Sequence, residues 1–130
     1  MIFSIVVTGA PYSSQASTSA LQFSKSLLKL GHRIHRVFFY ADGVHSGSAL
    51  AAPPQDETNI PADWAALARE HELDLVVCIA AAVRRGVLDQ NEARRYEKNG
   101  HNLGDDFNLS GLGQLVEAGI LSDRVVTFGA

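Results

Sequence analysis

The sequence LDLVVCIAAAVRRG, residues 73–86, sets the expected fold because it joins a buried strand to a cationic turn. Its first part, 73–77, is mostly apolar and is typical of a strand covered on both faces in a parallel sheet. Cys78 follows at the end of that strand, and the Arg-Arg-Gly at 84–86 predicts an exposed loop. Ligands and reactive groups gather outside the carboxyl ends of strands in open α/β sheets. Cys78 is therefore the first candidate for chemistry.

Two interpretations of Cys78 remain open on the residues alone. Positive charge from Arg84 or Arg85 would favour the thiolate over the thiol, and the thiolate is the nucleophilic form. Free cysteine is also among the most buried residue types and often behaves as a small, inert hydrophobe. In that second interpretation the two arginines form a solvated loop face.

Working outward from this segment, the pattern of apolar residues predicts an α/β fold. A β-branched run over 2–8 indicates a strand, and apolar residues at three- and four-residue steps over 15–30 indicate a helix. A second strand follows over 34–40, and a right-handed crossover makes the two strands parallel. The remaining segments are predicted as a long loop over 42–60, a helix from Pro61 to near Glu72, a short helix over 91–96, a loop over 98–109, a helix capped by Ser110 and ended by Gly119, and a strand over 124–128.

Composition bounds the class of protein. The chain has 130 residues, of which 46% are hydrophobic and 19% charged, with no linker-like tract, and this predicts one globular domain over 1–130. The formal net charge of -3 argues against direct binding to nucleic acid, which requires clustered Lys and Arg.

The same composition predicts a compartment. One cysteine excludes an internal disulfide, and the start of the chain lacks the pattern of a cleaved signal. No apolar stretch approaches the roughly 20 residues of a membrane span. We expect a cytoplasmic protein without a membrane segment.

Other groups of residues that could form a functional site give weaker signals. Hydroxyl groups in the loop over 8–14 precede a helix and offer a phosphate or flavin site, which keeps a flavodoxin-like cofactor-binding module as an alternative. Neither of the common phosphate-loop motifs is present, and serines before a helix usually act as caps. The five histidines lack the paired spacing of a helical metal site, so we predict no metal site and interpret them as solvated surface.

Several blocks of sequence together resemble the DsrE/TusD family, and the resemblance covers essentially the whole chain. These blocks are Ile5–Gly9, the helix start at Gln15–Phe23, Val37–Tyr40 with Asp42–Val44, Cys78–Ala82 with Arg84–Gly86, and Ser110–Gly113. The resemblance implies a three-layer α/β/α sandwich with a mostly parallel central sheet. It also implies a sulfurtransferase without a metal or organic cofactor.

In such a protein the matching cysteine, Cys78, accepts sulfane sulfur as a persulfide and passes it to a partner. The implied donor is TusA-like and the implied acceptor is TusE- or DsrC-like. The implied assembly is a heterohexamer with TusB-like and TusC-like subunits, which correspond to DsrH-like and DsrF-like chains. Arg84 and Arg85 would stabilise the thiolate or the persulfide.

The family has two branches with different pathways. One feeds 2-thiolation of the wobble uridine in tRNA, and the other serves sulfur oxidation with a dissimilatory sulfite reductase running in reverse. The opening Val-Val-Thr-Gly at 6–9 and the closing Val-Val-Thr-Phe at 125–128 favour the TusD branch. A non-catalytic assembly subunit with an inert Cys78 remains an alternative.

Overall fold

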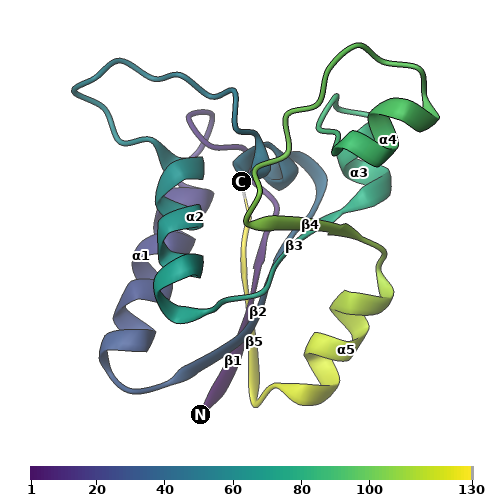
Figure 1. The fold of residues 1–130 in the computed structure, drawn as a ribbon. Helices are drawn as coiled ribbons and strands as arrows, with labels where there is room; N and C mark the ends of the chain where they lie inside the picture. Colours follow the sequence, from purple (N-terminus) through teal and green to yellow (C-terminus); the bar gives the residue numbers. More distant parts are fainter. Residues whose placement is uncertain (130) are drawn as a thin grey trace.

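The computed structural model describes residues 1–129 and contains one parallel sheet, seen close to edge-on in Figure 1. Its strands are β1 (Ile2–Val7), β2 (Arg33–Phe39), β3 (Leu75–Cys78), β4 (Phe107–Ser110) and β5 (Arg124–Phe128). They lie in the order β4-β3-β2-β1-β5, and every neighbouring pair is parallel. The carboxyl ends of all five strands therefore lie at the same end of the molecule.

Helices cover both faces of this sheet, which confirms the predicted three-layer sandwich. Figure 1 shows α1 (Ala16–Lys29) and α2 (Ile60–His71) on one face and α5 (Gly113–Leu121) on the other. Three short helices lie at the carboxyl end of the sheet: η1 (Ala41–Gly47), α3 (Ile79–Val83) and α4 (Gln90–Arg95). Among the described residues, none of the helices combines the length and the apolar character needed to cross a membrane.

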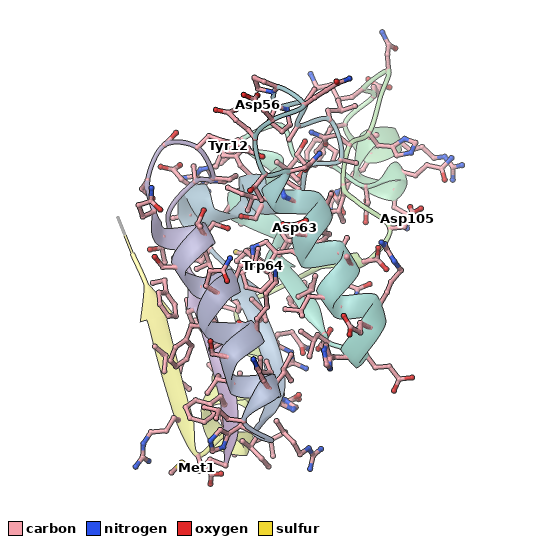
Figure 2. The ribbon with its side chains drawn as sticks, turned by 90° about the vertical axis from the view of Figure 1, so that its left-hand side faces the viewer. Met1, Tyr12, Asp56, Asp63, Trp64 and Asp105 are labelled. Atoms are coloured by element: carbon pink, nitrogen blue, oxygen red, sulfur yellow. The ribbon has the colours of Figure 1, made fainter. Side chains whose placement is uncertain are left out.

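The core fills the space between the central strands and the α1–α2 layer. Phe39 on β2 is fully buried and meets the indole of Trp64 on α2 edge-on, with ring centroids 5.3 Å apart. Figure 2 shows Trp64 at the junction of α1 and α2. Its Nε1 donates to Ser17 Oγ at 3.0 Å, and Ser17 Oγ lies 2.8 Å from Ser46 Oγ on η1. Because a buried indole N–H needs an acceptor, this chain of hydrogen bonds fixes α1, α2 and η1 to one another.

A buried arginine holds α5 against the opposite face. Arg36 on β2 donates from Nε to Asp74 Oδ2 at 2.7 Å and from Nη2 to Glu117 Oε1 at 3.2 Å. Its Nη1 donates to the carbonyl oxygen of Gln114 at 2.8 Å. A buried guanidinium requires such partners, so the segment before β3 and the start of α5 are tied to β2.

Two predictions for the C-terminal half are wrong. The segment predicted as a loop over 98–109 ends in the edge strand β4, which was missed because four residues, Phe-Asn-Leu-Ser, are too few to show a period. Ser110 pairs with Cys78 as the last residue of that strand and does not cap a helix. Helix α5 begins at Gly113 and continues through Gly119 to Leu121, because tertiary contacts outweigh the weak helix propensity of glycine.

The long connection predicted over 42–60 also begins with structure, the helix η1. Gly43 is buried there, and a Cβ at this position would collide with the carbonyl oxygen of Val7 at the end of β1. The amide of Tyr40 donates to the same carbonyl at 2.9 Å, so the chain before and within η1 lies close to the end of β1. Glycine is therefore required for η1 to pack against β1.

We predict that Gly43→Ala lowers the free energy of unfolding by about 1–3 kcal/mol, the usual cost of overpacking. Urea unfolding followed by tryptophan fluorescence measures the change through the buried Trp64. Gly100→Ala is the matched control, because nothing lies within 4 Å of a Cβ there. Equal midpoints for the two variants would contradict the close approach of η1 to β1.

Candidate functional site

Cys78 lies where three strands end. It is the last residue of β3 and the N-cap residue of α3, which confirms its predicted place at a strand's carboxyl end. The residue is only 3% exposed, yet it lines a pocket of about 360 Å³. The sulfur is therefore largely shielded and borders this pocket, which we call the Cys78 pocket.

The parallel register of the sheet builds the walls of the Cys78 pocket. Val77 is aligned with Phe39 on β2, and Cys78 is aligned with Ser110 on β4. The residues that follow these strands therefore meet around the sulfur. One wall comes from Tyr40 and Ala41 after β2, a second from Ile79, Ala80 and Ala81 of α3, and a third from Gly111 and Leu112 after β4.

Both predicted arginines, Arg84 and Arg85, line the same pocket, but their surroundings differ. Arg85 donates from Nε to Asp42 Oδ1 at 2.8 Å and from Nη1 to the carbonyl oxygen of Ala81 at 3.1 Å. Within residues 1–129, Arg84 has no ion-pair partner. The charge of Arg85 is thus largely balanced, while Arg84 presents the free positive charge beside the pocket.

Asp42 is a member of the site that sequence reasoning missed. It lies on η1, and its hydrogen bond from Arg85 together with the positive charge of Arg85 lowers the pKa of its carboxyl group below 3.8. Asp42 stays ionised at neutral pH and anchors the turn after α3 to η1. The missed wall residue Tyr40 carried one usable signal, because it directly follows β2, whereas Gly111 carried none, because β4 was not recognised in the sequence.

In the loop over 8–14, the side chains of Thr8, Tyr12 and Ser14 form hydrogen bonds within the chain. The Tyr12 hydroxyl donates to the carbonyl oxygen of Thr58 at 2.8 Å and accepts from the amide of Ile60 at 3.0 Å. Figure 2 shows Tyr12 and Asp56, a residue of the long loop, at the same end of the molecule. Tyr12 thus fastens the long connection to the first loop, and its hydroxyl is engaged within the chain.

The histidines are only partly as predicted. No three potential metal-ligating side chains cluster anywhere in the part of the chain that the structure describes. His71 and His101 are exposed, but the Nε2 atom of His35 is buried without a hydrogen-bond partner and lies 3.9 Å from Glu117 Oε1. The interpretation of all five as solvated surface is therefore wrong for His35, because the packing of α5 against β2 covers it.

The arrangement suits reversible chemistry on one sulfur atom. Cys78 is the only cysteine in the sequence, so no second thiol in the chain can form a disulfide with it. A thiolate in a pocket can attack a sulfur–sulfur bond of an incoming molecule and can later be displaced in the same way. Fold and site together define an α/β protein with a single thiol in a pocket at a strand end.

Comparison with known proteins identifies the class further. A model of the DsrE/DsrF-like family matches residues 1–128. The chain is 53% identical over 129 residues to the sulfurtransferase TusD homolog of Pseudomonas aeruginosa, covering 99% of this chain and 98% of the relative. It is 47% identical over 126 residues to the sulfurtransferase TusD of Sodalis glossinidius, covering 97% of each. The chain therefore belongs to the DsrE/DsrF-like family, and it is a sulfurtransferase that works in a sulfur relay.

Two further matches are consistent with this assignment. A protein of Allochromatium vinosum that is named as a DsrE sulfurtransferase is 53% identical over 129 residues, covering 99% of each chain. The crystal structure of the ychN protein from E. coli superposes with a TM-score of 0.78 over 98% of this chain and 99% of that chain. At 21% sequence identity, that likeness shows the fold alone.

We predict that Arg85→Gln raises the pKa of the Asp42 carboxyl group toward its ordinary value of 3.8. A neutral amide removes the positive charge and the charge-assisted hydrogen bond that now favour the carboxylate. The stability that the ion pair contributes is fully present above the ordinary pKa of 3.8. It is lost as the pH falls through the lower pKa of the folded state. An NMR titration of the carboxyl carbon measures the change.

Arg84→Gln is the matched control for this titration, since Arg84 makes no ion pair with any residue from 1 to 129. An unchanged Asp42 titration in Arg85→Gln would show that the ion pair does not form in solution.

Proposed function

We propose that Cys78 carries sulfane sulfur as a persulfide and that the chain, 1–130, acts as one sulfur-carrier domain. The observation that carries this proposal is the position of the only thiol of a sulfurtransferase inside a pocket formed by three strand ends. The Cys78 pocket gives the sulfur an approach from outside while excluding most solvent. It also leaves volume for one additional sulfur atom.

The loading step balances without an added oxidant. The Cys78 thiolate attacks the outer sulfur of a donor persulfide, and a new sulfur–sulfur bond forms at Sγ. The bond within the donor persulfide breaks, and the donor leaves as a thiolate. In the unloading step an acceptor thiolate attacks the outer sulfur of the Cys78 persulfide, and Cys78 leaves as a thiolate. Both steps exchange one sulfur–sulfur bond for another.

The acceptor of this sulfur is another protein. A carrier with a second cysteine could release its cargo by forming an internal disulfide, but this chain has no second cysteine. By family resemblance we propose a TusA-like donor, a TusE- or DsrC-like acceptor, and a heterohexamer with TusB-like and TusC-like subunits. A reducing compartment keeps a thiol of this kind free, and we propose the cytoplasm as the site of the relay.

Arg84 and Arg85 have different roles in this proposal. The free guanidinium of Arg84 favours the anionic thiolate and persulfide by its charge. Arg85 holds the turn after α3 in place through Asp42 and the carbonyl oxygen of Ala81, and adds less charge because Asp42 balances it.

For the pathway, we propose the relay that leads to 2-thiolation of the tRNA wobble uridine. Several relatives named TusD support this choice, among them two that are 47% and 53% identical. The relative named DsrE is equally similar to this chain, at 53%, and favours sulfur oxidation as the second candidate. The chemistry at Cys78 is the same in both pathways.

We predict that Cys78→Ser folds normally but carries no sulfur, because the change in volume is small and serine cannot form a persulfide. Intact mass spectrometry without reductant, after incubation with a cysteine desulfurase, cysteine and a TusA-like donor, measures a gain of roughly 32 Da, one sulfur atom, on the native chain only. A sulfur-dependent mass gain on the serine variant would contradict the proposal. So would an uncharged native chain, alone and in its assembled complex, beside a demonstrably charged donor.

We predict that Arg84→Ala slows this loading about two- to fivefold without stopping it, the range expected for one partly solvated charge, and that Arg85→Ala slows it less. The time course of the same mass gain measures the rates. Arg94→Ala is the matched control, since Arg94 is exposed and lies outside the Cys78 pocket. Loading rates equal to that of Arg94→Ala would show that neither arginine contributes to sulfur loading.

We predict that deleting the gene removes 2-thiouridine from tRNA, and that the native chain restores it while Cys78→Ser does not. Mass spectrometry of nucleosides from total tRNA measures the modified base. Undiminished 2-thiouridine in the deletion strain would assign the protein to the second candidate pathway.

A further inference from the structure

A second and larger cavity adjoins the Cys78 pocket. It measures about 800 Å³ and is lined by residues of α3 and of the segment that includes α4. Figure 1 shows these two short helices side by side at the upper right. Three residues, Ile79, Ala80 and Arg84, line both this cavity and the Cys78 pocket. The two spaces therefore adjoin along α3, and we call the larger one the α3–α4 groove.

The base and sides of the α3–α4 groove are apolar. Ile79 and Val83 of α3 line one side, Leu88 is buried below, and the exposed ring of Tyr96 stands at the end of α4. An exposed tyrosine ring beside aliphatic side chains is the kind of surface on which an apolar side chain of a partner packs.

The rim of the groove is cationic. Arg84, Arg95 and Lys98 line it together with a single acid, Glu92. Glu92 Oε1 lies 3.9 Å from Arg95 Nη1, and the guanidinium of Arg95 lies over the Tyr96 ring at 5.6 Å from its centroid. The rim thus keeps an excess of positive charge in a chain whose formal net charge is -3. Local charge of this sign, against the sign of the whole molecule, selects an anionic occupant.

The position of the groove beside the Cys78 pocket indicates what that occupant is. A small sulfur compound would need only the Cys78 pocket, whereas a polypeptide that presents a sulfur to Cys78 also covers the surface next to the pocket, and beyond Ile79 and Arg84 that surface is the groove. We propose that the α3–α4 groove holds a segment of the partner that exchanges sulfur with Cys78, with apolar side chains against Val83 and Tyr96 and acidic side chains at Arg95 and Lys98. This inference rests on the proposed function and adds the chemistry by which the partner is recognised.

The test measures how fast Cys78 reacts with defined peptides. Each short peptide carries one cysteine, activated as a 2-pyridyl disulfide, followed by leucines and charged residues. Attack by the Cys78 thiolate forms a mixed disulfide and releases 2-thiopyridone, whose absorbance gives the rate. The charged residues are glutamates in one peptide and lysines in the other. A small uncharged disulfide, 4,4′-dithiodipyridine, reports the reactivity of the thiol without using the groove.

We expect the native full-length chain at low salt to react about tenfold faster with the acidic peptide than with the basic one. This ratio is the combined effect of two exposed ion pairs. Replacing the leucines of the acidic peptide by serines should slow it. The double variant Arg95→Glu and Lys98→Glu should abolish the preference for acid. Lys25→Glu with Lys29→Glu is the matched control, because it changes the net charge equally on exposed positions of α1, across the sheet.

The outcomes separate the two proposals. Equal rates for the acidic and basic peptides, or loss of the preference in the Lys25 and Lys29 control as well, would overturn the groove as a docking site while leaving Cys78 as the carrier. A Cys78 that fails to react even with 4,4′-dithiodipyridine would overturn the proposed function, and the groove with it.

Discussion

The parallel alignment of β2, β3 and β4 is the constraint on which the rest of this structure depends. Parallel strands end at the same edge of a sheet, so the residues after each strand meet there without being neighbours in the sequence. Cys78 ends β3, Tyr40 follows β2 and Gly111 follows β4, and together they surround one pocket. An antiparallel neighbour would have placed a strand start at that position.

The packing beneath the site keeps this edge in place. Trp64 and its hydrogen bond to Ser17 tie the two helices of one layer to η1, and buried Arg36 ties α5 to β2 on the other. Since η1 carries Asp42, the same packing sets where Arg85 is held. Removing the partner of a buried polar group destabilises the folded state. These hydrogen bonds therefore select one arrangement of the helices and strands as well as stabilising it.

Charge is distributed unevenly over the finished molecule. In an acidic chain, three cationic residues and one acid, Glu92, line the groove next to the only thiol: Arg84, Arg95 and Lys98. The position of that charge decides which groups approach Cys78, because opposite charges near a pocket raise the local concentration of a complementary partner. The site proposed for sulfur transfer and the groove proposed for partner recognition thus adjoin, with Arg84 lining both.

The sequence by itself determined the α/β class, the central strands and the place of Cys78, since long apolar runs and glycine turns are local signals. It did not reveal β4, the extent of α5 or the buried Nε2 of His35, because these follow from contacts between distant segments. Only the tertiary structure decided that Arg85 is paired with Asp42 while Arg84 is free. Charge pairing over 43 positions depends on which segments the sheet brings together, and spacing in the sequence does not record it.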